Sequence, residues 1–360
     1  AAARASAGRG ARVTLVRRAP GATALSMGSW QGPLPALLAE HFQAVDHPWL
    51  ALSRPLPSPD GSVRRFDRAA TAQAAAHFTD NTLVCGIEGL PAFQARVLAR
   101  MWSEWTGTDV LASMVRLKRT PAAGWSPPSL AAEIARDASE LAPEIAARVH
   151  EMRATSVIVP AVLGLDGTDS PRRAIESITG VPVGEALGSA PSIPGWRLDS
   201  ALERMLQRAG IVQLRGMVEL QRKNHRQVER VVVRTGNAHS ELAGGSFILA
   251  TGKYVGGGIR ADGRLREPAL DCPVWIEHAG EVFEQAEPLT LTNADRREEQ
   301  PLLAAGVAVD AEGRPLDRNG QLVYDNVFTA GAVRRGYDSD GFGLGHAAAQ
   351  GWAAGERATA

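Results

Sequence analysis

Cysteine is scarce in this sequence: Cys85 and Cys272 are its 2 cysteines among 360 residues. They form no CxxC pair and no spacing that is typical of an iron–sulfur cluster. The sequence therefore excludes an iron–sulfur centre within this chain, and no metal site is predicted. The two thiols are predicted to be reduced, as in a cytosolic protein.

Long apolar runs and an excess of charge of one sign are also missing. No apolar run approaches the ~20 residues that a membrane-spanning helix needs. No long apolar segment follows the first residues, as a signal peptide would require. Basic and acidic side chains balance at 39 each. This composition gives no indication of nucleic-acid binding or of direct contact with an anionic membrane surface.

A third absence concerns the start of a dinucleotide-binding unit. The pattern predicts a helix over residues 1–8 and a strand over Val13–Val16, which we interpret as the second strand of such a unit. No Gly-x-Gly-x-x-Gly loop precedes it, so we expect an N-terminal truncation or a misassigned start. Arg17 and Arg18 stand where an acidic residue often binds the ribose hydroxyls, which leaves FMN open beside FAD.

What the sequence does contain is a glycine-rich stretch near its C-terminus. Val327–Ala330 is a short apolar run that is typical of a buried parallel strand, and Gly331 stands at its end. Residues from His346 onward predict a helix that packs through small side chains. The loop between strand and helix contains Gly336, Gly341, Gly343 and Gly345. Strand, glycine loop and helix in this order favour a site where backbone amides approach a planar or phosphorylated ligand.

This stretch carries a family resemblance. Residues 313–355 are similar to the C-terminal flavin-binding signature of the fumarate reductase and glycerol-3-phosphate dehydrogenase flavoproteins. More closely, Asn326–Asp338 and Gly341–Gly345 resemble the pattern of the family formed by the B subunits of anaerobic glycerol-3-phosphate dehydrogenase. The resemblance covers nearly all of the chain after residue 10. It implies an α/β two-domain flavoprotein with a Rossmann-like FAD-binding domain, incomplete in its first βα unit, an inserted α/β cap domain, and FAD or FMN as the cofactor.

A second motif supports the resemblance. Phe247–Ala250 is predicted to be a buried strand with Thr251 and Gly252 at its exit. It is similar to the Ala-Thr-Gly motif that two-domain flavoproteins place beside the dinucleotide, and Gly256–Gly258 would let the backbone pass close to the flavin. A Ser- and Gly-rich turn near residue 28 corresponds to one that the resembled families place against the flavin ring, although an ordinary polar loop explains it equally well. The residues expected to contact the flavin are Ser26, Gly28, Ser29, Ala250, Thr251, Gly252, Gly331, Ala332, Gly341, Phe342, Gly343, Leu344 and Gly345.

The resemblance also divides the chain. Residues 1–75 and 191–360 are expected to form the flavin-binding domain, and residues 76–190 the inserted cap or substrate domain, in which strand and helix patterns alternate. Pro91 is expected to open a helix over residues 92–106, and Ser129 to cap the next helix. Residues 33–68 are rich in proline and irregular in pattern, and His47–Trp49 and Pro55–Pro59 are expected to form surface loop.

Oxidation of a secondary alcohol by a flavin needs a base for the hydroxyl proton. His346 is the leading candidate, because the positive end of a helix favours a neutral imidazole; alternatively, it only stacks on or bonds to the flavin. Lys253 is the second candidate. Arg260 or Arg266 is expected to hold a substrate phosphate, because guanidinium groups offer it several donors. The alternative for these arginines is a solvated hairpin end.

The resemblance implies an enzyme: a flavin-dependent oxidoreductase subunit that oxidises sn-glycerol 3-phosphate to dihydroxyacetone phosphate and passes electrons to quinone. Its partners would be a larger flavoprotein, the A subunit, together with an iron–sulfur protein, the C subunit. The protein would then be cytoplasmic and peripheral to the inner face of the cell membrane through the complex. Two alternatives stay open: another fumarate reductase-type flavin enzyme that acts on a dicarboxylate or a steroid, and a non-catalytic partner that keeps the fold.

Overall fold

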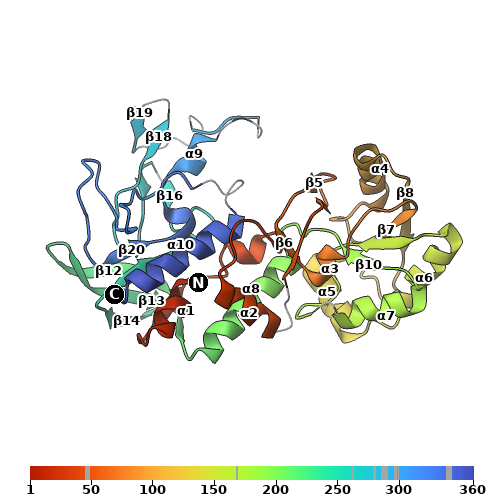
Figure 1. Cartoon of the computed structure of the whole chain (residues 1–360), viewed down its shortest axis with the longest axis horizontal. Helices are drawn as coiled ribbons and strands as arrows, with labels where there is room; N and C mark the ends of the chain where they lie inside the picture. The colour runs from red at the N-terminus through yellow and green to blue at the C-terminus, as the bar shows by residue number, and fades with distance from the viewer. Residues whose placement is uncertain are drawn as a thin grey trace. The chain divides into compact units, whose positions relative to one another are not determined.

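The computed structural model describes residues 1–44, 49–167, 169–261, 263–278, 281–284, 291–295, 298, 300–337 and 343–360. The chain divides into two compact units (Figure 1). The first unit comprises Ala1–Ala22, Gln31–Leu38 and Arg204–Ala360, and the second comprises Thr23–Trp30 and Ala39–Glu203. The expected domain boundaries at residues 75 and 190 stay a prediction.

Two parallel strand pairs organise the first unit. Strand β1 (Thr14–Arg17) pairs with β11 (Val212–Arg215), and β15 (Phe247–Leu249) pairs with β20 (Val327–Thr329). The expected strands at the start of the chain and at the two glycine motifs are thus confirmed. Leu249 and Val327 are buried in the core of this unit, as the apolar character of both runs requires.

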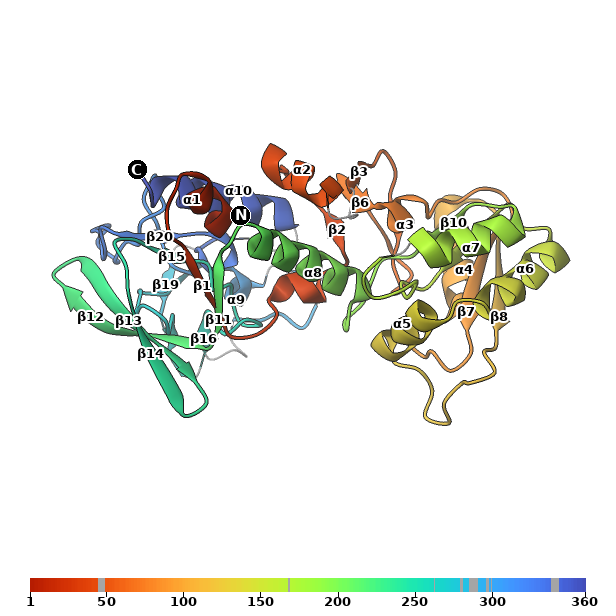
Figure 2. The same cartoon turned by 90° about the horizontal axis from the view of Figure 1, so that it is seen from below.

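The first and last helices of the chain lie side by side in this unit (Figures 1 and 2). Helix α1 (Ala2–Gly8) packs along α10 (Gly343–Arg357) through small side chains. Ser6 Oγ donates a hydrogen bond to the Gly355 carbonyl at 2.9 Å. A side chain at Gly355 would meet the Ala2 carbonyl oxygen at 2.4 Å, so glycine is required for the close approach of the two helices.

The rest of the first unit is mainly antiparallel. Strands β12 (Met217–Asn224), β13 (Gln227–Thr235) and β14 (Ala238–Ala243) form a three-stranded sheet (Figure 2). The expected hairpin over residues 217–236 is therefore confirmed and gains a third strand. Smaller elements complete the unit: β16 (Arg260–Ala261) with β17 (Leu265–Arg266), β18 (Ile276–His278) with β19 (Glu281–Phe283), α9 (Pro301–Ala304) and the 3-10 helix η3 (Gly331–Val333).

A four-stranded parallel sheet forms the centre of the second unit, in the order β10-β9-β7-β8. Its strands are β7 (Thr82–Ile87), β8 (Val110–Val115), β9 (Ser156–Val159) and β10 (Val183–Glu185). Helices α4 (Ala95–Thr106), α5 (Pro127–Arg136), α6 (Leu141–Met152) and α7 (Asp169–Thr179) alternate with them. Every residue of β7 is buried, as in parallel strands that are covered on both faces. The expected alternation of strand and helix is confirmed.

Two helix starts differ from expectation. Helix α4 begins at Ala95 rather than at residue 92, because Gly89, with φ of 82°, and Pro91 belong to a turn that leaves β7. Helix α5 begins at Pro127 and is capped by Ser126 rather than by Ser129. Proline suits the first helical positions because its φ is already helical. Ser129 instead completes a capping box with Ser126.

The expectation of surface loop at His47–Trp49 and Pro55–Pro59 was wrong where the structure describes these residues, because Trp49 and Leu56–Pro57 are buried and belong to short strands. His47 and Pro48 lie outside the described residues. Both segments belong to the proline-rich stretch of residues 33–68. This stretch contains α2 (Ala36–Ala44), β3 (Trp49–Ala51), β4 (Leu56–Pro57) and β5 (Val63–Arg64); β2 (Ser29–Trp30) precedes it and β6 (Arg68–Ala70) ends it, followed by the short helix α3 (Thr71–Ala74). The rings of Trp30, Phe42 and Trp49 form a buried cluster with centroids 5.6–6.2 Å apart. Aromatic burial of this kind outweighs the loop preference of the prolines.

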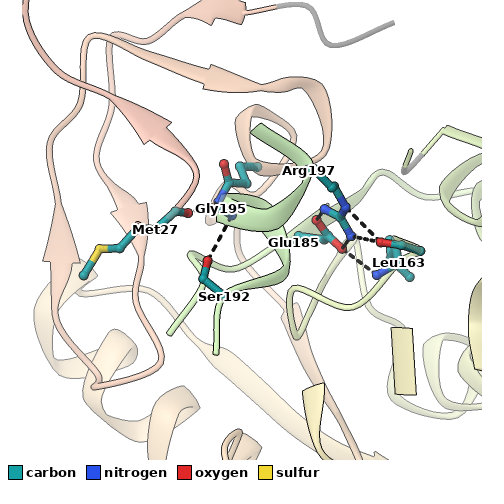
Figure 3. Close-up of polar contacts among 8 residues, drawn as sticks. Met27, Leu163, Glu185, Ser192, Gly195 and Arg197 are labelled. Carbon is teal, nitrogen blue, oxygen red and sulfur yellow. Dashed lines mark hydrogen bonds and ion pairs between the residues drawn. The ribbon is translucent and has the colours of Figure 1, made fainter. Parts of the chain in front are cut away.

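A buried ion pair joins helix α8 (Ile193–Arg208) to the parallel sheet of the second unit (Figure 3). Arg197 Nη1 donates to Glu185 Oε2 at 2.6 Å, and Nη2 donates to Oε1 at 3.0 Å. The guanidinium also donates twice to the Gly164 carbonyl, and Glu185 Oε1 accepts the Leu163 N–H. The pair therefore fixes the loop after β9, the end of β10 and the first turn of α8 to one another.

Candidate flavin site

The carboxyl ends of β15 and β20 lie at one edge of their parallel pair. Leu249 stands opposite Thr329 in the register, and the Ala330 N–H donates to the Leu249 carbonyl at 2.9 Å. Ala250, Thr251 and Gly252 therefore leave their strand beside the residues that leave β20. In open sheets of parallel strands, ligands bind at this edge. The structure thus brings together two predicted motifs that are far apart in sequence.

Gly331 connects the end of β20 to helix α10. Its φ is 75°, a conformation that favours glycine, and its N–H donates to Gln350 Oε1 at 2.9 Å. The position of a Cβ on Gly331 lies 3.6 Å from Ala347 Cβ. Ala332 follows in η3. The strand exit and the first half of α10 are therefore in direct contact.

The first turn of α10 is covered by a neighbouring backbone segment. The helix begins at Gly343, three residues before the expected start, and Gly341 and Phe342 lie outside the described residues. The Gly345 N–H donates to the Gln31 carbonyl at 2.8 Å. A Cβ on Gly345 would lie 2.3 Å from that oxygen, and one on Gly32 would lie 2.9 Å from His346 Nδ1. Glycine at residues 32 and 345 permits the close contact between the backbone of residues 31–32 and the first turn of α10.

Gln31 and Gly32 were not among the predicted site residues. A glycine at the end of a polar turn was the one available signal, and it does not reveal which helix the turn will contact. Leu344, which was predicted, lies in the same first turn of α10 and is partly buried.

Hydrogen bonds link the loop after β15 to the start of α10. Lys253 Nζ donates to the Tyr337 carbonyl at 2.9 Å, and the Tyr337 hydroxyl donates to the Gly343 carbonyl. The two predicted base candidates, Lys253 and His346, therefore both belong to the assembly around α10 in the first unit. Beside Lys253, burial raises the pKa of Tyr254 to about 12, so that phenol stays neutral at physiological pH.

Two buried hydroxyl groups at this strand edge have no hydrogen-bond partner among the described residues. They are Thr251 Oγ1, at the exit of β15, and Thr329 Oγ1, at the end of β20. Buried polar groups are nearly always satisfied in folded proteins. The two hydroxyls therefore have hydrogen-bonding capacity that a ligand at this edge could use.

The predicted serine turn lies in the second unit, whereas the strand exits and α10 lie in the first. Ser26 Oγ donates to the Thr23 carbonyl at 2.7 Å and accepts the Gly28 N–H at 3.3 Å. A Cβ on Gly28 would lie 2.0 Å from Pro194 Cβ. Ser29 Oγ is buried and has no hydrogen-bond partner among the described residues. Flavin contact by these three residues stays a prediction.

The two predicted substrate arginines stand opposite each other. Arg260 in β16 pairs with Arg266 in β17, and both belong to the first unit. Arg260 Nη2 lies 3.8 Å from Met217 Sδ, and Arg266 is exposed. Like charges on directly opposed residues repel each other. Binding of a substrate phosphate by these arginines stays a prediction.

Two kinds of feature are absent from the described residues. No group of three or more His, Cys, Asp or Glu side chains there is arranged to hold a metal ion. In the same part of the chain, no helix has both the length and the apolar character that crossing a membrane requires.

Comparison with known proteins identifies the family. Residues 62–342 match a family model described as an FAD binding domain. The probable B subunit of anaerobic glycerol-3-phosphate dehydrogenase from Halobacterium salinarum is 30% identical over 320 residues, which cover 84% of this chain and 73% of the relative. The B subunit of anaerobic glycerol-3-phosphate dehydrogenase from Yersinia pestis is 27% identical over 264 residues, which cover 71% of this chain and 59% of the relative.

Among solved structures, a 3-ketosteroid-delta4-(5alpha)-dehydrogenase from Rhodococcus jostii RHA1 is 12% identical, with a TM-score of 0.26, and the match covers 78% of this chain and 95% of that one. A likeness at this level carries no argument about fold or function. The family model and the Halobacterium relative identify the family without this likeness. They confirm the resemblance that the glycine motifs predicted. This protein belongs to the FAD-binding flavoprotein oxidoreductases, in the family of the B subunits of anaerobic glycerol-3-phosphate dehydrogenase, and its cofactor is FAD.

Proposed function

We propose that this protein is the flavoprotein subunit of an enzyme that oxidises sn-glycerol 3-phosphate to dihydroxyacetone phosphate. Membership of the B-subunit family supports the substrate class. The observation that carries the proposal is the common edge of β15 and β20, where Thr251 Oγ1 and Thr329 Oγ1 are buried without partners among the described residues. A dinucleotide cofactor has oxygen and nitrogen atoms for both hydroxyls.

The residues at this edge suit FAD. Gly331 and Gly252, both with positive φ, allow the backbone to approach a planar ring system at the two strand exits. FAD, when bound, accepts the hydride that leaves the alcohol carbon. We assign the first unit to a Rossmann-like FAD-binding domain, because its two parallel pairs and the α1–α10 contact agree with that fold. The parallel sheet of the second unit is assigned to the cap.

His346 is the better of the two base candidates. Lys253 donates to a backbone carbonyl, and a carbonyl acceptor stabilises the charged ammonium, which cannot take a proton. His346 stands in the first turn of α10, beside Gly32. In this assignment His346 takes the hydroxyl proton of the substrate, and Arg260 with Arg266 holds its phosphate.

The relatives are named as B subunits, so further proteins belong to the proposed assembly. The larger flavoprotein A subunit, together with the iron–sulfur C subunit, would receive the electrons and pass them to quinone. The two cysteines of this chain are single buried thiols, Cys85 and Cys272, so an electron relay through iron–sulfur clusters needs another protein. The assembly would lie at the inner face of the cell membrane, and this chain would touch the membrane only through a partner.

The first test is the visible absorption spectrum of the purified protein. Flavin bands are expected, and acid should release FAD in stoichiometric amount. A dye-linked assay then compares sn-glycerol 3-phosphate with fumarate and steroid substrates. A colourless protein that takes up no added FAD would refute the cofactor site and leave a non-catalytic partner. Turnover with fumarate or a steroid alone would refute the substrate and favour the wider fumarate reductase type.

Replacement of His346 by glutamine tests the proposed base. We expect turnover to fall by about 10²–10⁴-fold, the usual contribution of a general base, while bound FAD is retained. Lys253→Gln serves as the comparison, because it removes the ammonium charge and keeps N–H donors in the side chain. Normal turnover of His346→Gln would dismiss histidine as the base.

A further inference from the structure

Arg18 follows the last residue of β1, where that strand reaches the carboxyl edge of its parallel pair. The side chain is exposed. Within the described part of the chain, its guanidinium makes no hydrogen bond and no ion pair. It extends over the loop of residues 252–258 that follows β15: Arg18 Nη1 lies 3.1 Å from the position of a Cβ on Gly257. An arginine from one strand end thus covers the glycine loop of another.

The glycines of the 252–258 loop allow its backbone to lie close to the residues at the exit of β15. Gly257 has φ of 72°. A Cβ on Gly258 would lie 2.1 Å from the Gly252 carbonyl oxygen, and one on Gly256 would lie 2.8 Å from the Thr251 carbonyl oxygen. The loop therefore folds back on the exit of β15 and presents no side chain at its glycines. Any side chain at residue 257 would displace the Arg18 guanidinium or be displaced by it.

The donors around this loop match one chemical class of ligand. Arg18 offers a planar set of N–H donors, which is the preferred partner of phosphate oxygens. Thr251 Oγ1, at the start of the same loop, is a buried hydroxyl without a partner among the described residues. A guanidinium beside Gly257 and a hydroxyl at the start of the loop offer the charge and the donors that a phosphate group binds. The oxidised isoalloxazine ring carries no negative charge, so the positive charge of Arg18 favours the phosphate over the ring.

We propose that Arg18 binds the diphosphate of FAD against the 252–258 loop, with the Thr251 hydroxyl as a further donor. The inference rests on the proposed cofactor site and adds an assignment to it. It also explains why a basic residue replaces the acidic one that often follows this strand in dinucleotide-binding proteins. An acidic side chain there binds ribose hydroxyls, whereas Arg18 neutralises phosphate charge.

The test compares the dissociation constants of FAD, ADP and riboflavin, measured by flavin fluorescence and by ADP competition. Arg18→Ala is expected to weaken FAD and ADP binding by roughly 10- to 100-fold, as for a lost hydrogen bond to a charged group, and to leave riboflavin binding unchanged. The FAD and ADP dissociation constants of Arg18→Lys should lie between those of the wild type and those of Arg18→Ala. FAD affinity should also depend less on salt in Arg18→Ala than in the wild type.

Arg12 provides the matched control, because it precedes the amino end of the same strand and is also exposed. Arg12→Ala makes the same change in net charge and should leave all three affinities unchanged. Unchanged FAD binding by Arg18→Ala, or an equal loss for riboflavin, would overturn the assignment of Arg18. A wild-type protein that binds no FAD would instead refute the proposed function, so the two failures are distinguishable.

Discussion

Removal of one partner from the buried Arg197–Glu185 pair should strongly destabilise the second unit. Arg197 is 5% exposed and Glu185 is 0% exposed, so neither charge is solvated by bulk water. Arg197→Met removes both bonds to the carboxylate and both bonds to the Gly164 carbonyl. Glu185 then keeps the Leu163 N–H as its remaining donor among the described residues.

A buried charge that loses its partner costs about 3–5 kcal/mol. With a urea dependence of about 2 kcal/mol per molar, the unfolding midpoint should fall by roughly 1.5–2.5 M. Urea unfolding followed by tryptophan fluorescence and circular dichroism measures the change. Because the chain has two compact units, a two-step unfolding curve should lose stability only in the step of the second unit.

Two further variants separate charge burial from loss of an arginine. Arg100→Met breaks an exposed pair with Glu104, whose side chains are 83% and 65% exposed, and should cost less than about 0.5 kcal/mol. The double variant Arg197→Met with Glu185→Leu should recover most of the loss, because an apolar pair replaces a buried ion pair at little cost. If Arg197→Met is as stable as Arg100→Met, the reasoning is wrong.

Three other predictions concern single sites. Gly345→Ala places a Cβ 2.3 Å from the Gln31 oxygen, so the free energy of unfolding, measured by thermal unfolding, should fall by about 1–3 kcal/mol. Gly351→Ala is the control: its Cβ would meet its nearest atom at 3.4 Å, and stability should not fall. Burial raises the pKa of Cys85 to about 12, so a thiol reagent at pH 8 should label it only after unfolding. Burial also raises the pKa of Glu267 above 4.5; the wild type should lose stability as pH rises through that raised value, and Glu267→Gln should not.

Local signals account for the parts of the fold that were predicted correctly. The apolar runs that form β15 and β20 are followed by Thr251-Gly252 and by Gly331. Each strand and its exit could therefore be predicted from one short stretch of sequence. Contacts between residues that are far apart in sequence could not be predicted in this way. The Gln31 carbonyl accepts from Gly345 near the other end of the sequence, and Arg197 meets Glu185 through the packing of α8. Neither partner follows from residue spacing.

The register between β15 and β20 brings two motifs that are far apart in sequence to one site. Leu249 stands opposite Thr329, and this alignment places both strand exits at the same level of the sheet. A slip of one residue would turn the buried faces of the pair outward and would separate the Thr251 and Thr329 hydroxyls. The apolar residues that bury the pair, among them Leu249 and Val327, hold this alignment. The core of the first unit therefore positions the site as directly as the glycines that line it.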